Sequence, residues 1–169
     1  AEKVVRYAPC TVMVLGRQED APGRFKNILL PVDFSKASHA AADVALEMAK
    51  KHGASLHLLH VYQNVVPPVY YVTTDKAFEW DPDLKKRGAQ ALRKFMSEHR
   101  VQGVDTIPHL VEGRIAHSIL DLSNKEDMDL IVMGTAGLTG VHHFMLGSVA
   151  EKVLRRADVP VLTVRAGAH

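Results

Sequence analysis

Short apolar runs alternate with longer stretches of helical periodicity from residue 27 onward. The apolar runs are predicted strands at 27–32, 55–61, 106–111, 130–133 and 161–164. The stretches between them are predicted helices at 36–52, 82–101, 114–124 and 148–157. Strands that alternate with helices of this length form βαβ units, which require parallel pairing. The pattern therefore predicts an α/β fold with an open, doubly wound, five-stranded parallel sheet that binds ligands at the carboxyl ends of its strands.

The composition limits the classes of function that the chain can have. Its 169 residues suffice for one full domain, and 47% hydrophobic with 24% charged residues is typical of a soluble globular protein. A net charge of +2 and the lack of an apolar run near the roughly 20 residues of a membrane span argue against nucleic-acid and membrane partners. Cys10 is the only cysteine, which excludes an intrachain disulfide and a multi-thiolate zinc site. We therefore expect a cytoplasmic protein.

The first residues repeat the last predicted helix and strand. AEKVVRYAPCTVMVL (1–15) and AEKVLRRADVPVLTV (150–164) share Ala, Glu, Lys, Val, Arg, Ala and Val at equivalent positions. Two amphipathic segments can agree by coincidence, but we interpret residues 1–23 as a helix-strand remnant of a preceding related domain, followed by a linker. Residues 24–169 are then the complete domain, and the chain is a fragment of a tandem protein.

A glycine-rich segment, GTAGLTGVHHFMLGS (134–148), joins a predicted strand to a predicted helix. Gly134 and Gly137 can shape the turn, because glycine lets backbone N–H groups approach an anion closely. Gly147 and Ser148 are expected at the N-terminus of the helix, where Ser148 could cap the helix and donate its hydroxyl to a phosphate. A connection whose glycines only permit turning is the alternative. No G-x-G-x-x-G follows a strand and no G-x-x-x-x-G-K-[ST] occurs, so a dinucleotide fingerprint and a P-loop are both absent.

The spacing of these glycines resembles a known signature. Gly134-x-x-Gly137, nine residues, then Gly147-Ser148 resembles the ATP-binding pattern of the universal stress protein family, G-x-x-G, nine residues, G-[ST]. The segments NILLPVDFS, AADVALEMAKKHGASLHLLHVY and RADVPVLTVR are similar to the same family, so the resemblance covers roughly residues 24–166. It implies strand order 3-2-1-4-5, a homodimer or pseudo-dimer through the last strand, and a pocket for ATP with Mg²⁺ between the first and fourth strands. Because Thr11–Leu15 resembles that last strand, we expect it to pair with Val161–Val164, within one chain or exchanged between two.

The resemblance also implies roles for individual residues. Pro31 and Val32 would wall the pocket, Asp33 would face the adenosine, and Val61 would meet the adenine through its backbone and side chain. Met133 and Gly134 would contact the ribose, and the phosphates would be held by Gly137, Gly147, Ser148 and Val149. His143 lies in the loop where many family members carry a basic residue. Two alternatives remain open: Asp33 could cap the helix that starts near Ser35, and Val61 and Met133 could be ordinary core. His57 and His60 are interpreted as strand or pocket-edge residues.

The sequence offers little for strong catalysis, because it contains no nucleophile with a matched base, no carboxylate pair of clear spacing and no evident metal cluster. The first hypothesis is therefore an ATP-binding stress-response module with at most slow ATP hydrolysis. The second is a nucleotide-independent interaction module of the same fold. The third is an ATP-using enzyme, which the lack of a second catalytic domain argues against.

Overall fold

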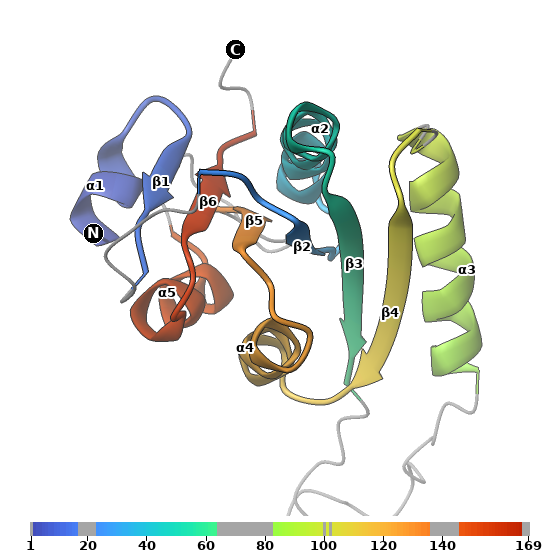
Figure 1. The fold of residues 1–169 in the computed structure, drawn as a ribbon. Coiled ribbons are helices and arrows are strands. Elements are labelled where there is room, and N and C mark those ends of the chain that lie inside the picture. Colours follow the sequence, from blue (N-terminus) through green and yellow to red (C-terminus); the bar gives the residue numbers. More distant parts are fainter. Residues whose placement is uncertain are drawn as a thin grey trace, which may run out of the picture.

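The computed structural model describes residues 2–16, 23–63, 83–99, 101, 103–135 and 146–166. These residues form one six-stranded sheet with the order β1-β6-β5-β2-β3-β4 and five helices (Figure 1). The strands are β1 Val12–Val14, β2 Asn27–Pro31, β3 Ser55–Tyr62, β4 Thr106–Glu112, β5 Leu130–Gly134 and β6 Val161–Val164. The helices are α1 Glu2–Tyr7, α2 Lys36–His52, α3 Leu84–Glu98, α4 Ile115–Lys125 and α5 Ser148–Arg156.

The five strands from β2 to β6 pair in parallel, in the order β4-β3-β2-β5-β6. This confirms the predicted α/β fold and the predicted order 3-2-1-4-5, and the observed elements differ from the predicted ones only at their ends. β2 pairs with β3 on one side and with β5 on the other, so the topological switch point of the sheet lies between β2 and β5. The chain therefore continues from β2 and from β5 to helices on opposite faces of the sheet.

Helices cover both faces of the sheet, which is why its central strands are apolar on both sides. Along β2, Ile28 and Leu30 pack with α2 and α3, whereas Leu29 packs with α4 and α5 on the opposite face. All three side chains are fully buried. Figure 1 shows α4 and α5 together on one side of the sheet and α2 on the other. In the part of the chain that the structure describes, no helix combines the length and apolarity needed to cross a membrane.

The N-terminal segment continues the sheet beyond β6. β1 pairs antiparallel with β6, as predicted for 11–15 and 161–164, and the pairing lies within the chain. Val12 lies opposite Thr163 and Val14 opposite Val161, around a central pair of Met13 and Leu162. In the sequence repeat, Val12 is equivalent to Val161 and Val14 to Thr163. The two copies of the repeat therefore meet with approximate two-fold symmetry, and β6 is an inner strand of the sheet.

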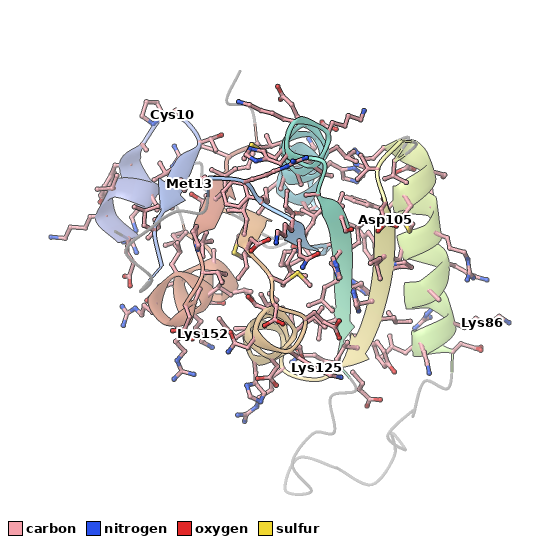
Figure 2. The ribbon with its side chains drawn as sticks, viewed as in Figure 1. Cys10, Met13, Lys86, Asp105, Lys125 and Lys152 are labelled. Atoms are coloured by element: carbon pink, nitrogen blue, oxygen red, sulfur yellow. The ribbon has the colours of Figure 1, made fainter. Side chains whose placement is uncertain are left out.

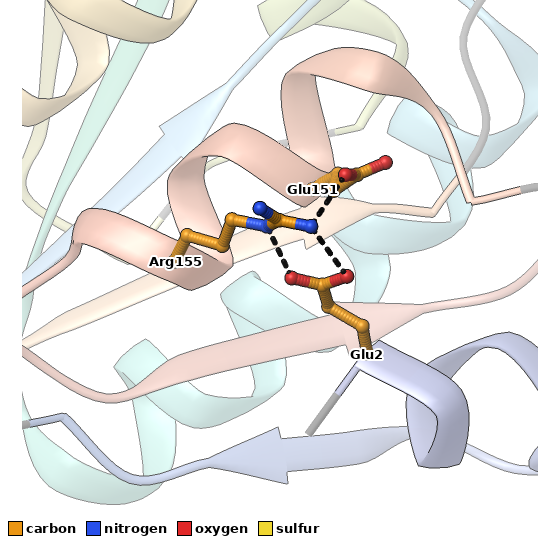
Figure 3. Close-up of polar contacts among 3 residues, drawn as sticks. All are labelled: Glu2, Glu151 and Arg155. Atoms are coloured by element: carbon orange, nitrogen blue, oxygen red, sulfur yellow. Dashed lines mark hydrogen bonds and ion pairs between the residues drawn. The ribbon is translucent and has the colours of Figure 1, made fainter.

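The helices of the repeat also contact each other. Arg155 of α5 donates from Nε and Nη2 to the carboxylate of Glu2 in α1, and its Nη2 also lies 3.0 Å from Oε1 of Glu151 (Figure 3). This guanidinium lowers the pKa of Glu2. The Arg165 side chain donates to the backbone carbonyl of Arg6 at 2.6 Å, and Val5 is buried against the core. Cys10, between α1 and β1, is exposed at the edge of the molecule (Figure 2).

Candidate functional site

A cavity of about 240 Å³ lies at the carboxyl ends of β2, β3 and β5, at the switch point of the sheet. Open α/β sheets bind their ligands at this position. Every predicted site residue that the structure describes lines this cavity, namely Pro31, Val32, Asp33, Val61, Met133, Gly134, Gly147, Ser148 and Val149. Gly137 and His143 lie outside the described residues.

The cavity has further lining residues that the sequence reasoning did not assign to a site. They are Ser35, Ser38, Leu59, Ile115, Ile119, Thr135 and Ala150, together with His60, which was interpreted as a strand or pocket-edge residue. Ile115 and Ile119 lie one helical turn apart at the start of α4. A helix that follows a parallel strand begins at the carboxyl edge of the sheet, so the place of these residues near the start of a predicted helix was the available signal for them. His57 is buried elsewhere, beside His109.

The turn from β2 to α2 forms one wall. Asp33 Oδ1 accepts a hydrogen bond from Ser35 N at 3.0 Å, and Ser35 Oγ accepts one from Ser38 N at 3.2 Å, which makes Ser35 the N-cap of α2. Between them, Phe34 has a φ of 63°, a left-handed conformation that costs a non-glycine residue on the order of 1 kcal/mol or more. Asp33 therefore orders the turn before the helix and lines the cavity at the same time.

The described ends of the glycine-rich segment line the cavity, and a hydrogen bond joins them. Gly147 N donates to the carbonyl of Thr135 at 2.7 Å, and Thr135 N donates to Val164 O at 2.9 Å. Gly134 and Gly147 therefore lie near each other at the base of the segment. α5 begins at Ser148, and its N-cap is Gly147 with no side-chain cap. The prediction that Ser148 caps this helix is wrong, because Ser148 is already the first helical residue.

The electrostatics of the cavity come from helix termini. α2, α4 and α5 all contribute residues of their first turns to the lining, and no Lys or Arg is among the described lining residues. The first N–H groups of a helix have no partner within the helix, and the aligned peptide dipoles add about half a positive charge there. Asp33 is the one acidic group among the described lining residues. The arrangement can hold an anion beside α5 and a hydrogen-bond donor beside Asp33.

The described residues contain no group of three or more His, Cys, Asp and Glu side chains that could hold a metal ion.

Comparison with known proteins settles the family. The sequence profile of the Universal stress protein family matches residues 24–165. The chain belongs to the universal stress protein family. A universal stress protein of Methanocaldococcus jannaschii is 36% identical over 142 residues, which cover 83% of this chain and 82% of that protein. The cavity is thus the switch-point cavity of a universal stress protein domain.

Two solved universal stress proteins share this fold. One from Archaeoglobus fulgidus matches with a TM-score of 0.70 and 26% identity, over 98% of this chain but only 53% of that one. Another, solved in complex with cAMP, matches with a TM-score of 0.65 and 23% identity, over 86% of this chain and 100% of that one.

Proposed function

We propose that this universal stress protein domain binds ATP in the switch-point cavity and acts as a nucleotide-responsive module of a cytoplasmic stress response. The observation that carries the proposal is the convergence of the two described ends of the glycine-rich segment, the first turn of α5 and the end of β3 on one cavity. Backbone N–H groups at the start of α5 suit phosphate oxygens, and the residues at the ends of β2 and β3 suit a nucleoside. We propose at most slow ATP hydrolysis.

One group of cavity residues would bind the phosphates and another would bind the nucleoside. Gly147, Ser148 and Val149 would bind phosphate oxygens through backbone N–H groups and the Ser148 hydroxyl. Asp33 would accept from a ribose hydroxyl or a base amine, while Val61 and Met133 would pack against the nucleoside. Mg²⁺, when bound, would be held chiefly by the phosphates. The similarity to the structure solved with cAMP shows a shared fold alone. The proposal therefore depends on the residues of this chain.

The direct test is mass spectrometry of small molecules released from freshly purified protein, followed by titration calorimetry with ATP, ADP, AMP and cAMP, with and without Mg²⁺. We expect ATP to co-purify or to bind with micromolar affinity or better. Ser148→Asp should weaken ATP binding at least about tenfold, because it places a carboxylate where a phosphate is expected. Ser97→Asp, on the exposed side of α3, is the matched control. Absence of any nucleotide binding would favour the nucleotide-independent interaction module.

We further propose that residues 1–23 are the last helix and strand of a preceding universal stress protein domain. The repeat, its symmetric pairing and the match to about half of the Archaeoglobus fulgidus structure support this. Burial supports it too. Val4 is 61% exposed and Leu15 54%, whereas their equivalents Val153 and Val164 are 0% and 3% exposed. In this proposal the rest of the preceding domain covers Val4 and Leu15, and β1 and β6 form the contact between the two domains.

A further inference from the structure

The hydrogen-bond pattern of β3 changes at the cavity. In a parallel sheet, the N–H and C=O of one residue point to one neighbouring strand, and those of the next residue point to the other. Leu59 O accepts from Val32 N at 2.8 Å, toward β2, and Tyr62 O accepts from Gly113 N at 3.1 Å, on the side of β4. The backbone of Val61 therefore points in the same direction as that of Leu59, toward β2.

β2 offers Val61 no partner in the described part of the chain. The strand ends at Pro31, and the next two acceptor and donor groups in register would be the carbonyl of Val32 and the N–H of Phe34. The left-handed conformation of Phe34 turns the chain away into α2. No hydrogen bond joins Val61 to Val32 or Phe34 among the described residues. The N–H and C=O of Val61 consequently face the cavity, which Val61 lines.

The imidazole of His60 binds the Val32 carbonyl, which would otherwise be the next acceptor for β3 along β2. His60 Nδ1 lies 2.8 Å from Val32 O. Since a carbonyl only accepts, Nδ1 carries the proton and donates. The ring is held from two sides, by Phe34 with ring centroids 4.6 Å apart, and by Gly88, where a Cβ would lie 3.3 Å from His60 Cδ2. The side chain of His60 is therefore fixed in place by its neighbours as well as by this hydrogen bond.

We propose that His60 is a positioning residue for base recognition: by donating to the Val32 carbonyl, it keeps the N–H of Val61 unpaired at the cavity wall, beside the C=O of Val61 that the turn at Phe34 leaves without a partner on β2. This inference rests on the proposed nucleotide function and deepens it. A backbone donor beside a backbone acceptor matches the edge of adenine, where the N1 acceptor adjoins the N6 amine. Hypoxanthine presents a donor at N1 and an acceptor at O6, so an inosine nucleotide in the same orientation would leave both groups of Val61 without partners.

The test uses substitutions that separate Nδ1 from the rest of the ring. His60→Asn keeps an amide donor near the position of Nδ1, whereas His60→Gln reaches toward Nε2 and His60→Phe keeps only the ring. In the ligand-free protein, hydrogen exchange of the Val61 amide should slow in the Gln and Phe variants, because Val32 O becomes available to it, and stay unchanged in the Asn variant. ATP affinity and the preference for ATP over inosine triphosphate should fall about tenfold or more in Gln and Phe and stay within about threefold in Asn.

The outcomes separate the two proposals. If the wild-type protein binds ATP but Gln, Phe and Asn variants bind and discriminate as it does, the role of His60 is overturned. Equal affinity of the wild-type protein for ATP and inosine triphosphate would overturn the base-edge assignment. If no adenine nucleotide binds, the proposed function fails, and the exchange of the Val61 amide still decides whether His60 keeps this group unpaired. Thermal melts of each variant exclude loss of folding as the cause.

Discussion

A Cβ atom on Gly134 would lie 2.7 Å from the Cβ of Ala37 and 2.8 Å from its carbonyl carbon. Gly134 ends β5, and Ala37 belongs to the first turn of α2, so strand and helix touch almost backbone to backbone beside the cavity. Side chains essentially never make such a contact below 3.0 Å. The first glycine of the family signature is therefore required for packing, whether or not a ligand is bound.

Replacement of this glycine should destabilise the fold. Gly134→Ala is expected to lower the free energy of unfolding by about 1–3 kcal/mol, because α2 must move away from β5. ATP affinity should fall with it, since the same contact sets the width of the cavity. Urea denaturation measures the first effect and calorimetry the second. Gly23→Ala is the control, because a Cβ there meets nothing within 4 Å. Equal stability of the two variants would show that the contact is loose.

Ser35 allows stability and binding to be separated. Ser35→Ala removes the acceptor for Ser38 N and should cost about 1 kcal/mol of stability. Ser35→Asp keeps an N-cap acceptor and should remain close to wild type in stability, but it adds a negative charge to the cavity lining and should weaken ATP binding. Thermal melts and calorimetry on both variants provide the measurement. Tight ATP binding by Ser35→Asp would contradict the placement of the nucleotide.

Two stacked histidines predict a pH dependence of stability. His57 Nδ1 lies 2.9 Å from His109 Nε2 on the neighbouring strand, with ring planes within 11° of parallel. Burial lowers the pKa of both residues, the nearby His109 lowers the pKa of His57 further, and Glu126 opposes these effects at both.

Because both pKa values are lowered in the folded state, the unfolded chain takes up protons first as the pH falls. The free energy of unfolding should therefore decrease below about pH 6.5, the ordinary histidine value, and this pair should have no effect well above it. Melting temperatures at pH 7.5 and 5.5 measure the decrease. It should shrink when both residues are replaced by Gln. An unchanged pH dependence in that double variant would assign the effect to other groups.

The N-terminal segment should control assembly. Removal of residues 1–20 exposes the edge of β6, which then has unpaired N–H and C=O groups and is free to pair with a second copy. We expect sedimentation velocity to show a shift from the state of the full chain to a dimer or larger species. Arg155→Ala, which breaks the contact with Glu2 but leaves β1 in place, should not produce this shift. An identical oligomeric state with and without the segment would argue against pairing through β6.

The sheet could be predicted because its strands are buried on both faces, so that runs such as Ile28, Leu29 and Leu30 are continuously apolar. The β1–β6 pairing was predictable for a different reason: β1 repeats the sequence of the last strand, and the family resemblance implies assembly through that strand. The cavity followed from the switch point and from the glycine spacing.

Other features of the cavity depend on three-dimensional detail. A Gly-Ser pair before a helix does not tell which residue is the N-cap, and here Gly147 takes that position with extended backbone angles. Ile115 and Ile119 have the spacing of ordinary core residues, and only the position of α4 brings them to the cavity. The hydrogen bond from His60 to Val32 joins a side chain to a backbone carbonyl, so no pattern of residue types predicts it.

The pairing of β1 with β6 joins residues such as Val12 and Thr163, which are 151 positions apart. During synthesis β1 leaves the ribosome before the central strands β2 to β5, and its partner strand β6 follows them. The central strands can therefore pair before β6 is made, and β1 has no partner strand until then. Closure of so long a loop is slow, and a polypeptide cut short before Val161 leaves β1 with no strand to pair with.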